Sequence, residues 1–526
     1  MNPTIRSKTL TFITFSIIFF SSIWTVKDYG HAWDNDLMRL TGFVNLKYII
    51  KKFYPNIETK IERVSKVPEL KEWRDRHYGP VMEVGLAIVE VVGGMIVNDK
   101  SKDNSHASYL MRCYLITLLV NISFIFFYKS LRLNNINRNL STAGLLLIAT
   151  YPRFFAELHY NTKDLFLVAM SMIAIYYGNR ILKKKKFKDL ILFCLFCAIC
   201  FVTRISAVII FCSFLILYLV KSEKNSIKKI FDLLKLLVIF FIFIIIFFPF
   251  LWENPLENLL SVFKAMSNHT FNGKVLYFGK VYHNAEAPWH YIIGWFLITT
   301  PISNLIMFSI VSLIIVAKIR FNLLYINNNY FLISNIFIFF GAIICLTIFQ
   351  NNTYNGWRHS YFIFPSFIII SIIGLNILFK KYKNIISIIL IGIITLNIYW
   401  ISKNHPHQYA FFNNLIKNPH KSFDVDWWGL SNREIIEKLD SLENKKIKIW
   451  VASGTSLMAT IKNIYPEKYL EKFIIVKEEN DADYILNNYI GNNKDYSKDY
   501  KLIYEVKVDN SPINSIYKNE KNFKNY

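Results

Sequence analysis

Long apolar segments alternate with short polar ones along most of the chain. Runs such as LLVIFFIFIIIFFPF at 236–250 and IISIILIGIITLNIYW at 385–400 carry no charge, and as helices they are long enough to cross a hydrocarbon core of about 30 Å. The pattern predicts a polytopic α-helical membrane protein with about eleven spanning helices. These lie at 9–26, 111–128, 140–152, 164–179, 190–203, 205–220, 236–251, 291–317, 329–349, 359–379 and 384–401. The first lacks a small-residue cleavage site and is expected to be an anchor.

The orientation follows from the basic residues between the spans. Lys and Arg number 21 in the loops on one side and 4 in the short loops on the other. Because basic loops stay in the cytoplasm, we expect a multi-pass protein of the inner (cytoplasmic) membrane with a cytoplasmic N-terminus and an extracytoplasmic C-terminus. The external parts are then residues 27–110, residues 252–290 and a C-terminal tail.

One apolar segment does not fit this scheme. GPVMEVGLAIVEVVGGMIV at 79–97 contains Glu83 and Glu90, and either carboxylate costs a few kcal/mol at the middle of a bilayer. Counting it as a span would also reverse the charge asymmetry of every later loop. We therefore predict a surface or re-entrant helix within the external loop 27–110.

The tail differs in composition from the rest of the chain. KKIKIWVAS at 445–453 and EKFIIVKE at 471–478 indicate strands, with a helix at 456–465 between them. The predicted organisation is a transmembrane catalytic domain at 1–402 and a small soluble external α/β domain at 403–526, a length within the usual domain range.

Composition narrows the function classes. Of the 526 residues 53% are hydrophobic and 19% charged, fewer charges than a soluble domain carries. The net charge of +24 lies mainly in short clusters between apolar runs, so no nucleic-acid partner is expected. The six cysteines fall inside apolar segments, which favours neither disulfides nor a zinc site.

The polar clusters that suit chemistry fall on the external side. Arg153, Lys163, Arg204, Arg358 and His359 are suited to surround a phosphate or diphosphate, since Arg offers paired donors and Lys a point charge. Asp34 and Asp36 are candidates for a general base toward an acceptor hydroxyl. Taken singly, each arginine is also explained as an interfacial anchor, and Asp36 as a helix cap. Their joint placement on one face is the signal for one external active site.

At these residues the chain resembles the GT-C superfamily of integral-membrane glycosyltransferases. The resemblance is to bacterial proteins related to glycosyltransferase family 39, the protein O-mannosyltransferase and aminoarabinose-transferase type. It rests on eight pieces in order: WDNDLMRLTG (33–42), YPRFFAELHYNTKDL (151–165), TRISAVI (203–209), FPFLWENPL (248–256), APWHYIIGWFLITTP (287–301), NGWRHSYFIFP (355–365), HPHQYAFFN (405–413) and DVDWWGLSNREIIEKL (424–439).

The resemblance implies a polyprenyl-phosphate-linked sugar as donor, the lipid bilayer as surroundings and an extracytoplasmic acceptor (a glycan, lipid or protein). An Asp-Glu pair in the first external loop holds the catalytic carboxylate in such enzymes. Asp34 matches the Asp, whereas Asn35 stands where Glu is usual, which leaves a divalent cation an open possibility. Asp34 is then the base of an inverting displacement, and the basic cluster neutralises the departing phosphate. Supporting carboxylates are Asp36 and Asp164, and further substrate-binding candidates are Arg39, Glu157, Trp289, His290 and His405.

Two other interpretations remain open from the residues. A transporter or flippase of lipid-linked sugars also combines many spans with membrane-level charge, although no internal repeat is found here. A non-catalytic relative that only binds lipid-linked sugar is supported by Asn35 alone.

Overall fold

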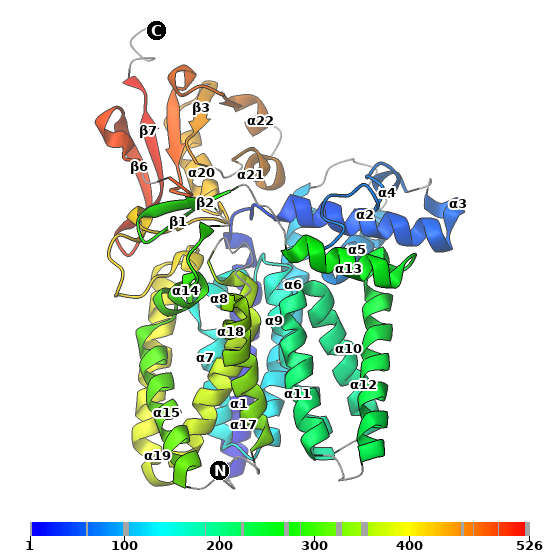
Figure 1. Cartoon of the computed structure of the whole chain (residues 1–526). Coiled ribbons are helices and arrows are strands. Elements are labelled where there is room, and N and C mark those ends of the chain that lie inside the picture. The colour runs from blue at the N-terminus through cyan, green and yellow to red at the C-terminus, as the bar shows by residue number, and fades with distance from the viewer. Residues whose placement is uncertain are drawn as a thin grey trace.

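The computed structural model describes residues 3–58, 61–97, 105–184, 186–221, 226–267, 273–283, 286–321, 329–348, 356–453, 457–465, 468–492 and 494–520. Its helices form an upright bundle, and a sheet-containing domain stands on one end of it (Figure 1). The N-terminal end of α1 lies at the opposite end of the bundle. The polytopic helical fold class with a C-terminal sheet domain is therefore confirmed.

The bundle consists of apolar helices in the predicted places. They are α1 (Pro3–Trp24), α6 (Ser105–Leu133), α7 (Arg138–Ala149), α9 (Asp164–Lys184), α10 (Phe187–Thr203), α11 (Val208–Lys221), α12 (Ser226–Phe247), α14 (Tyr291–Thr299), α15 (Ile302–Phe321), α17 (Tyr330–Ile336), α18 (Ala342–Ile348) and α19 (Phe364–Lys403). Each of the eleven predicted segments is mainly helical. Residues 150–151, 248, 300–301 and 329 are not helical, and residue 349 lies outside the described part.

By length and apolar composition alone, seven helices of the described chain qualify as membrane spans. The number is below eleven for two reasons. Helices α7, α10 and α11 have fewer than 18 residues, and residues 358–403 count once although they hold two predicted segments. The break between those two segments is at Tyr382, where φ −122° and ψ 35° leave the helical region. The chain is thus a multi-pass membrane protein.

Burial separates a core from a lipid-facing rim. Helix α9 is the most enclosed span, with 83% of its apolar window buried, whereas α12 has only 17%. Close contacts need small residues: a Cβ on Gly178 of α9 would come 2.6 Å from the Phe214 ring of α11. Outward-facing side chains such as Leu313 and Val316 of α15 are apolar and exposed, as expected toward lipid.

Short helices lie across the end of the bundle that carries the sheet domain. They are α2 (Asn35–Phe53), α3 (Pro55–Glu58), α4 (Glu62–Ser65), α5 (Val81–Val97) and α13 (Pro255–Ser267), with α8 (Pro152–Glu157) just below (Figure 1). Helix α5 is the segment predicted not to span, and it is absent from the candidate spans of the described chain. It packs on α2, where a Cβ on Gly42 would meet the Glu83 carbonyl oxygen at 2.4 Å. The sequence prediction for 79–97 agrees with this placement.

The acidic residues of α5 are neutralised by basic partners. Glu83 forms an ion pair with Arg112 of α6, both almost fully buried, and accepts a 2.5 Å hydrogen bond from Thr162. Glu90 pairs with Arg39 of α2 and lies 3.6 Å from Arg63. These pairs tie the crossing helices to each other and to the bundle.

The C-terminal sheet has the order β4-β3-β5-β7-β6. Strands β3 (Ile447–Val451), β4 (Phe473–Ile475) and β5 (Tyr484–Asn487) run parallel to one another. Strand β7 (Ser511–Lys518) runs antiparallel to both of its neighbours, β5 and β6 (Lys501–Val508). Helices α20 (Asn432–Leu442), α21 (Leu457–Ile464) and α22 (Lys468–Lys472) accompany them. The predicted strands and the helix at 456–465 are found, residue 456 lying outside the described part. A hairpin of β1 (Lys274–Tyr277) and β2 (Lys280–His283) lies beneath this sheet (Figure 1).

Candidate active site

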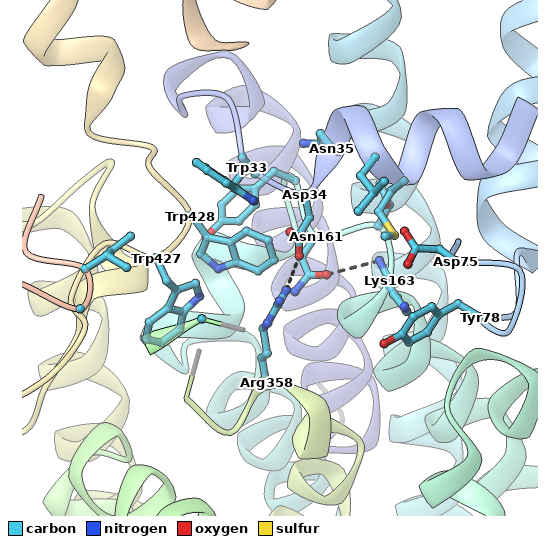
Figure 2. Close-up of a pocket in the computed structure, with 18 of the residues that line it drawn as sticks. Trp33, Asp34, Asn35, Asp75, Tyr78, Asn161, Lys163, Arg358, Trp427 and Trp428 are labelled. Atoms are coloured by element: carbon cyan, nitrogen blue, oxygen red, sulfur yellow. Dashed lines mark hydrogen bonds and ion pairs between the residues drawn. The ribbon is translucent and has the colours of Figure 1, made fainter. Parts of the chain in front are cut away.

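A cavity of about 880 Å³ lies between the end of the bundle and the sheet domain. Segments from the whole chain line it: Ala32 to Asn35, Leu37, Met38, Arg74, Asp75, Tyr78, Tyr160 to Lys163, Arg204, Gly273, Lys274, Arg358, Trp427, Trp428, Ala452, Ser453 and Ile490 to Asn492. Figure 2 shows Trp33, Trp427 and Trp428 on one side and Lys163, Asp75 and Tyr78 on the other, with Asp34 and Arg358 between them.

Asp34 stands immediately before α2. Its side chain makes no capping hydrogen bond to that helix, and its Oδ2 instead accepts a 2.8 Å hydrogen bond from Nη1 of Arg358. The Asp34 side chain is 29% exposed, whereas that of Arg358 is 5% exposed. Arg358 also lies 3.6 Å from Asp164 and 4.7 Å from the centre of the Trp428 ring. The carboxylate of Asp34 is therefore available to a ligand, held by a buried guanidinium.

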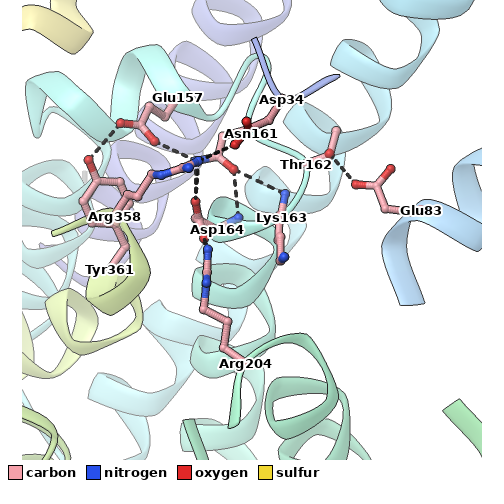
Figure 3. Close-up of polar contacts among 10 residues, drawn as sticks. All are labelled: Asp34, Glu83, Glu157, Asn161, Thr162, Lys163, Asp164, Arg204, Arg358 and Tyr361. Atoms are coloured by element: carbon pink, nitrogen blue, oxygen red, sulfur yellow. Dashed lines mark hydrogen bonds and ion pairs between the residues drawn. The ribbon is translucent and has the colours of Figure 1, made fainter. Parts of the chain in front are cut away.

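Asp164 begins α9 and joins two of the predicted cations. Its Oδ1 accepts hydrogen bonds from Arg204, at 2.8 Å from Nε, and its Oδ2 faces Arg358 (Figure 3). Asn161 shapes this helix start, because its Oδ1 accepts from the backbone N–H of Asp164 at 2.8 Å. With Lys163 included, three cations face two carboxylates, which leaves an excess of one positive charge.

Of the three cavity cations, Lys163 is the one for which no ion pair is found among the described residues. Burial, followed by the charge of Arg204, lowers the pKa of Lys163 to about 7 despite the nearby Asp164 and Asp34. Its Nζ lies 3.8 Å from the centre of the Tyr78 ring. An anion bound in the cavity would favour the charged amine, so Lys163 is suited to bind a phosphate.

Glu157 lies behind the cavity wall. It is fully buried, accepting hydrogen bonds from Tyr361 at 2.8 Å and from Asn161 at 2.7 Å (Figure 3). Burial raises the pKa of Glu157 to about 7, although both hydrogen bonds oppose the shift. The residue does not line the cavity, contrary to its predicted role in substrate binding. It supports Asn161, which does line it.

Arg153 is the predicted phosphate ligand that the structure places elsewhere. It is fully buried and does not line the cavity. Its Nε and Nη2 donate to the carbonyl oxygen of Phe411 at 3.1 and 2.9 Å, and its guanidinium lies 4.7 Å from the centre of the Trp427 ring. Rings of Trp295 and Phe412 cover it further. Its interactions hold the segment after α19 against α8.

Asp36 and Arg39 are not among the residues that line the cavity. Asp36 lies 3.4 Å from His31 Nε2 and accepts a 3.1 Å hydrogen bond from Asn463 of α21. Burial opposes its ionisation, but the bonds from His31 and Asn463 outweigh this and lower the pKa of Asp36. Arg39 is engaged with Glu90. Both residues serve contacts between elements rather than the cavity.

The remaining predicted residues also lie outside the cavity lining. Trp289 is 58% exposed, and His290 contacts the hydroxyl of Tyr277 through Nδ1 at 2.9 Å. His405 pairs with Asp28 at 2.8 Å. His359 follows Arg358 in the chain but is not among the lining residues.

Sequence reasoning did not single out several lining residues. Arg74, Asp75 and Tyr78 come from the loop WRDRHYGP at 73–80, where charges between Trp73 and Pro80 were an available signal. Ala452, Ser453 and Ile490 to Asn492 are uncharged and carry no such signal. As for metals, no group of three or more His, Cys, Asp or Glu side chains among the described residues is arranged to hold an ion.

A family model matches the middle of the helical part of the chain. Residues 106–252 match the model described as dolichyl-phosphate-mannose-protein mannosyltransferase. The matched part runs from α6 to the end of α12 and includes Lys163, Asp164 and Arg204. This match confirms the predicted resemblance to membrane glycosyltransferases.

Two solved structures of ArnT from Cupriavidus metallidurans are similar to the chain. The apo structure has a TM-score of 0.47 at 9% identity, and the structure bound to undecaprenyl phosphate has a TM-score of 0.45 at 9% identity. In both cases 97% of each chain is covered. No match to a curated protein sequence was found.

Proposed function

We propose that the protein is a membrane glycosyltransferase that moves a sugar from a polyprenyl-phosphate donor to an acceptor hydroxyl outside the cytoplasm. The observation that carries this proposal is the pairing of a partly exposed carboxylate, Asp34, with Lys163, Arg204 and Arg358 in one cavity at the end of the helix bundle. The family match over 106–252 supports the same reaction class.

Asp34 is placed to act as the general base. The acceptor oxygen forms a bond to the anomeric carbon of the sugar, the bond from that carbon to the phosphate oxygen breaks, and Asp34 takes the acceptor proton. Arg358 fixes the direction of the Asp34 carboxylate through the 2.8 Å hydrogen bond. The electron pair of the broken bond leaves with the lipid phosphate.

The three cations stabilise the negative charge of the departing lipid phosphate. A sugar phosphodiester carries one negative charge, and a second develops on the lipid phosphate as the bond breaks. The excess positive charge of the cluster and the low dielectric of the cavity stabilise this developing charge. Arg204 and Arg358 are held by Asp164, so they need little reorganisation, and Lys163 gains its full charge when the phosphate arrives.

The cavity is assigned to the outer face of the inner membrane, with the N-terminus in the cytoplasm. The charge asymmetry of 21 to 4 supports this orientation, because the basic loops lie at the end of the bundle away from the cavity. Residues 403–526 are assigned as the external domain. An extracytoplasmic acceptor and a polyprenyl-linked donor then both reach the site without crossing the membrane.

The test is a comparison of cell-envelope lipids and glycans by mass spectrometry. Host cells lacking the protein should lose a glycosyl mass increment, and the wild-type gene should restore it. The Asp34→Asn variant should not restore it, whereas Asp36→Asn, whose contacts lie outside the cavity, should. Full restoration by Asp34→Asn would contradict the transferase proposal and favour transport of a lipid-linked sugar.

A further inference from the structure

The sheet domain and the β1–β2 hairpin together supply the wall of the cavity that faces away from the membrane. We call this wall the roof and define it as Gly273–Lys274, Ala452–Ser453 and Ile490–Asn492. Strands β3 and β5 are parallel neighbours, and the second and third roof segments follow their carboxyl ends. Ligands commonly bind at the carboxyl edge of parallel strands, because side chains and backbone groups of the following loops converge there. The roof is therefore built like a binding site and not only like a cover.

One buried carboxylate holds the roof together. Asp424 is 1% exposed, and its two oxygens accept from the backbone N–H of Gly491 at 2.7 Å and of Leu276 at 3.2 Å. It thereby joins the loop after β5 to strand β1, next to Lys274. Gly491 has φ +56°, a conformation that favours glycine. Both bonds of Asp424 go to the backbone of the roof and its neighbouring strand, and none goes to the cations of the cavity.

The roof carries one formal charge. Lys274 is exposed, and no ion pair of it is found among the described residues, while the other roof residues are uncharged. Arg74, which also lines the cavity, is 3.4 Å from Asp75 and so partly neutralised. Near the roof, Trp33 is 45% exposed although it lines the cavity, and its backbone is fixed by a 2.9 Å hydrogen bond to the carbonyl oxygen of Trp428. An exposed lysine and an exposed aromatic ring thus face the same space.

The geometry of an inverting displacement indicates which substrate binds in the space beside the roof. If the donor phosphate binds at Lys163 and Arg204, its lipid tail leaves toward the membrane end. An inverting displacement then brings the acceptor from the opposite side of the sugar, which is the side of the roof. We propose that the roof and Trp33 form the acceptor subsite, and that the acceptor is a saccharide bearing a negatively charged group. This inference rests on the proposed transferase function.

Each part of the subsite has a chemical role in this proposal. The Trp33 ring offers an apolar face to a sugar ring. Lys274 binds the anionic substituent, which is a carboxylate or a phosphate. Asp424 is a positioning residue, because it touches the roof backbone and not the cavity itself.

The experiment is equilibrium binding to the full chain in lipid nanodiscs by microscale thermophoresis. The probes are hyaluronan tetrasaccharide as a carboxylate, pentamannose 6-phosphate as a phosphate, and maltotetraose as a neutral sugar. At least one anionic probe should bind about fivefold more tightly than maltotetraose, the size expected for one exposed charge pair. Lys274→Ala should abolish this preference. Lys280→Ala should keep it, because Lys280 is an exposed lysine of the same hairpin outside the cavity.

Two further variants test the positions of the groups. Trp33→Ala should weaken binding of the anionic and neutral probes alike, whereas Trp33→Phe should retain most of it. Asp424→Asn should weaken the probes but leave undecaprenyl phosphate binding unchanged, which a global folding defect would not do. No anionic preference, or equal effects of Lys274→Ala and Lys280→Ala, would overturn the inference.

Failure of this inference is distinguishable from failure of the proposed function. Undecaprenyl phosphate is titrated in parallel against the wild type and Lys163→Ala. If undecaprenyl phosphate binds through Lys163 but the anionic probes show no preference for the roof, the acceptor inference is wrong and the transferase proposal stands. If undecaprenyl phosphate does not bind at all, the transferase proposal fails with it.

Discussion

Replacing Asp34 by Asn is the sharpest perturbation of the proposed chemistry. The amide keeps the shape of the side chain and can still accept the hydrogen bond from Arg358, but it cannot take a proton. Loss of a general base lowers turnover by about 10²–10⁴-fold, equivalent to about 2.7–5.5 kcal/mol of transition-state stabilisation. Sugar transfer should fall by this factor.

The same change should hardly affect folding. Asp34 is 29% exposed and makes no capping bond to α2, and the amide that replaces it keeps the hydrogen bond from Arg358. Arg358 keeps its contact with Asp164 at 3.6 Å, so its charge remains compensated. The thermal unfolding midpoint in detergent should therefore stay close to that of the wild type.

The assay follows transfer of radiolabelled sugar from a polyprenyl-phosphate donor into the envelope fraction of deletion cells, using purified protein. Asp36→Asn is the matched control, since Asp36 contacts His31 and Asn463 rather than the cavity. Turnover of Asp34→Asn within twofold of the wild type would refute the assignment of the base. A loss as large in Asp36→Asn would show that the geometry between α2 and α21 matters more than the Asp34 proton.

Four further predictions follow from the other contacts. Affinity for undecaprenyl phosphate should decline as the pH rises through about 7, by at most about tenfold per unit, because the lowered pKa of Lys163 means that its charge is lost there; in Lys163→Met the titration should be flatter. Arg112→Met should destabilise the fold by about 3–5 kcal/mol, since it leaves Glu83 buried without its ion-pair partner, and adding Glu83→Leu should recover part of the thermal midpoint. Arg153→Lys should lower the thermal midpoint but not the affinity for undecaprenyl phosphate, because Arg153 binds the Phe411 carbonyl and not the cavity. Ser441→Cys should react with a membrane-impermeant maleimide in outer-permeabilised cells, and labelling only after lysis of the inner membrane would reverse the topology.

The membrane part of the fold was predictable because its signal is local. A span is predicted from the apolar character of about 20 consecutive residues. The basic loops then show which end of each helix lies on which side of the membrane. That same ordering places Asp34, Lys163, Arg204 and Arg358 at one end of the bundle. Their convergence in one cavity follows from topology, and the structure shows it.

The parts of the site that were not predicted correctly depend on contacts between distant segments, which no local sequence pattern contains. Arg153 belongs to the same end of the bundle, but the rotation of α8 turns it toward Phe411 and Trp427, which lie far along the chain. Glu157 is turned inward by the same helix. The roof was not predicted because all its residues except Lys274 are uncharged, and its three segments meet only through the register of β3 and β5 and the Asp424 bonds to the β1 hairpin.

The order of strands in the sheet has a consequence for biosynthesis. The roof loop after β5 belongs to a strand whose outer neighbour is β7, the last strand of the chain. Until β7 has been made, β5 is an edge strand with unpaired backbone groups, and the wall it carries has no fixed shape. The floor of the cavity, in contrast, is complete once the helices up to Arg358 have inserted. A chain that stops before β7 would thus hold the floor of the cavity without a formed wall above it, so the pairing of β7 with β5 would control when the site is complete.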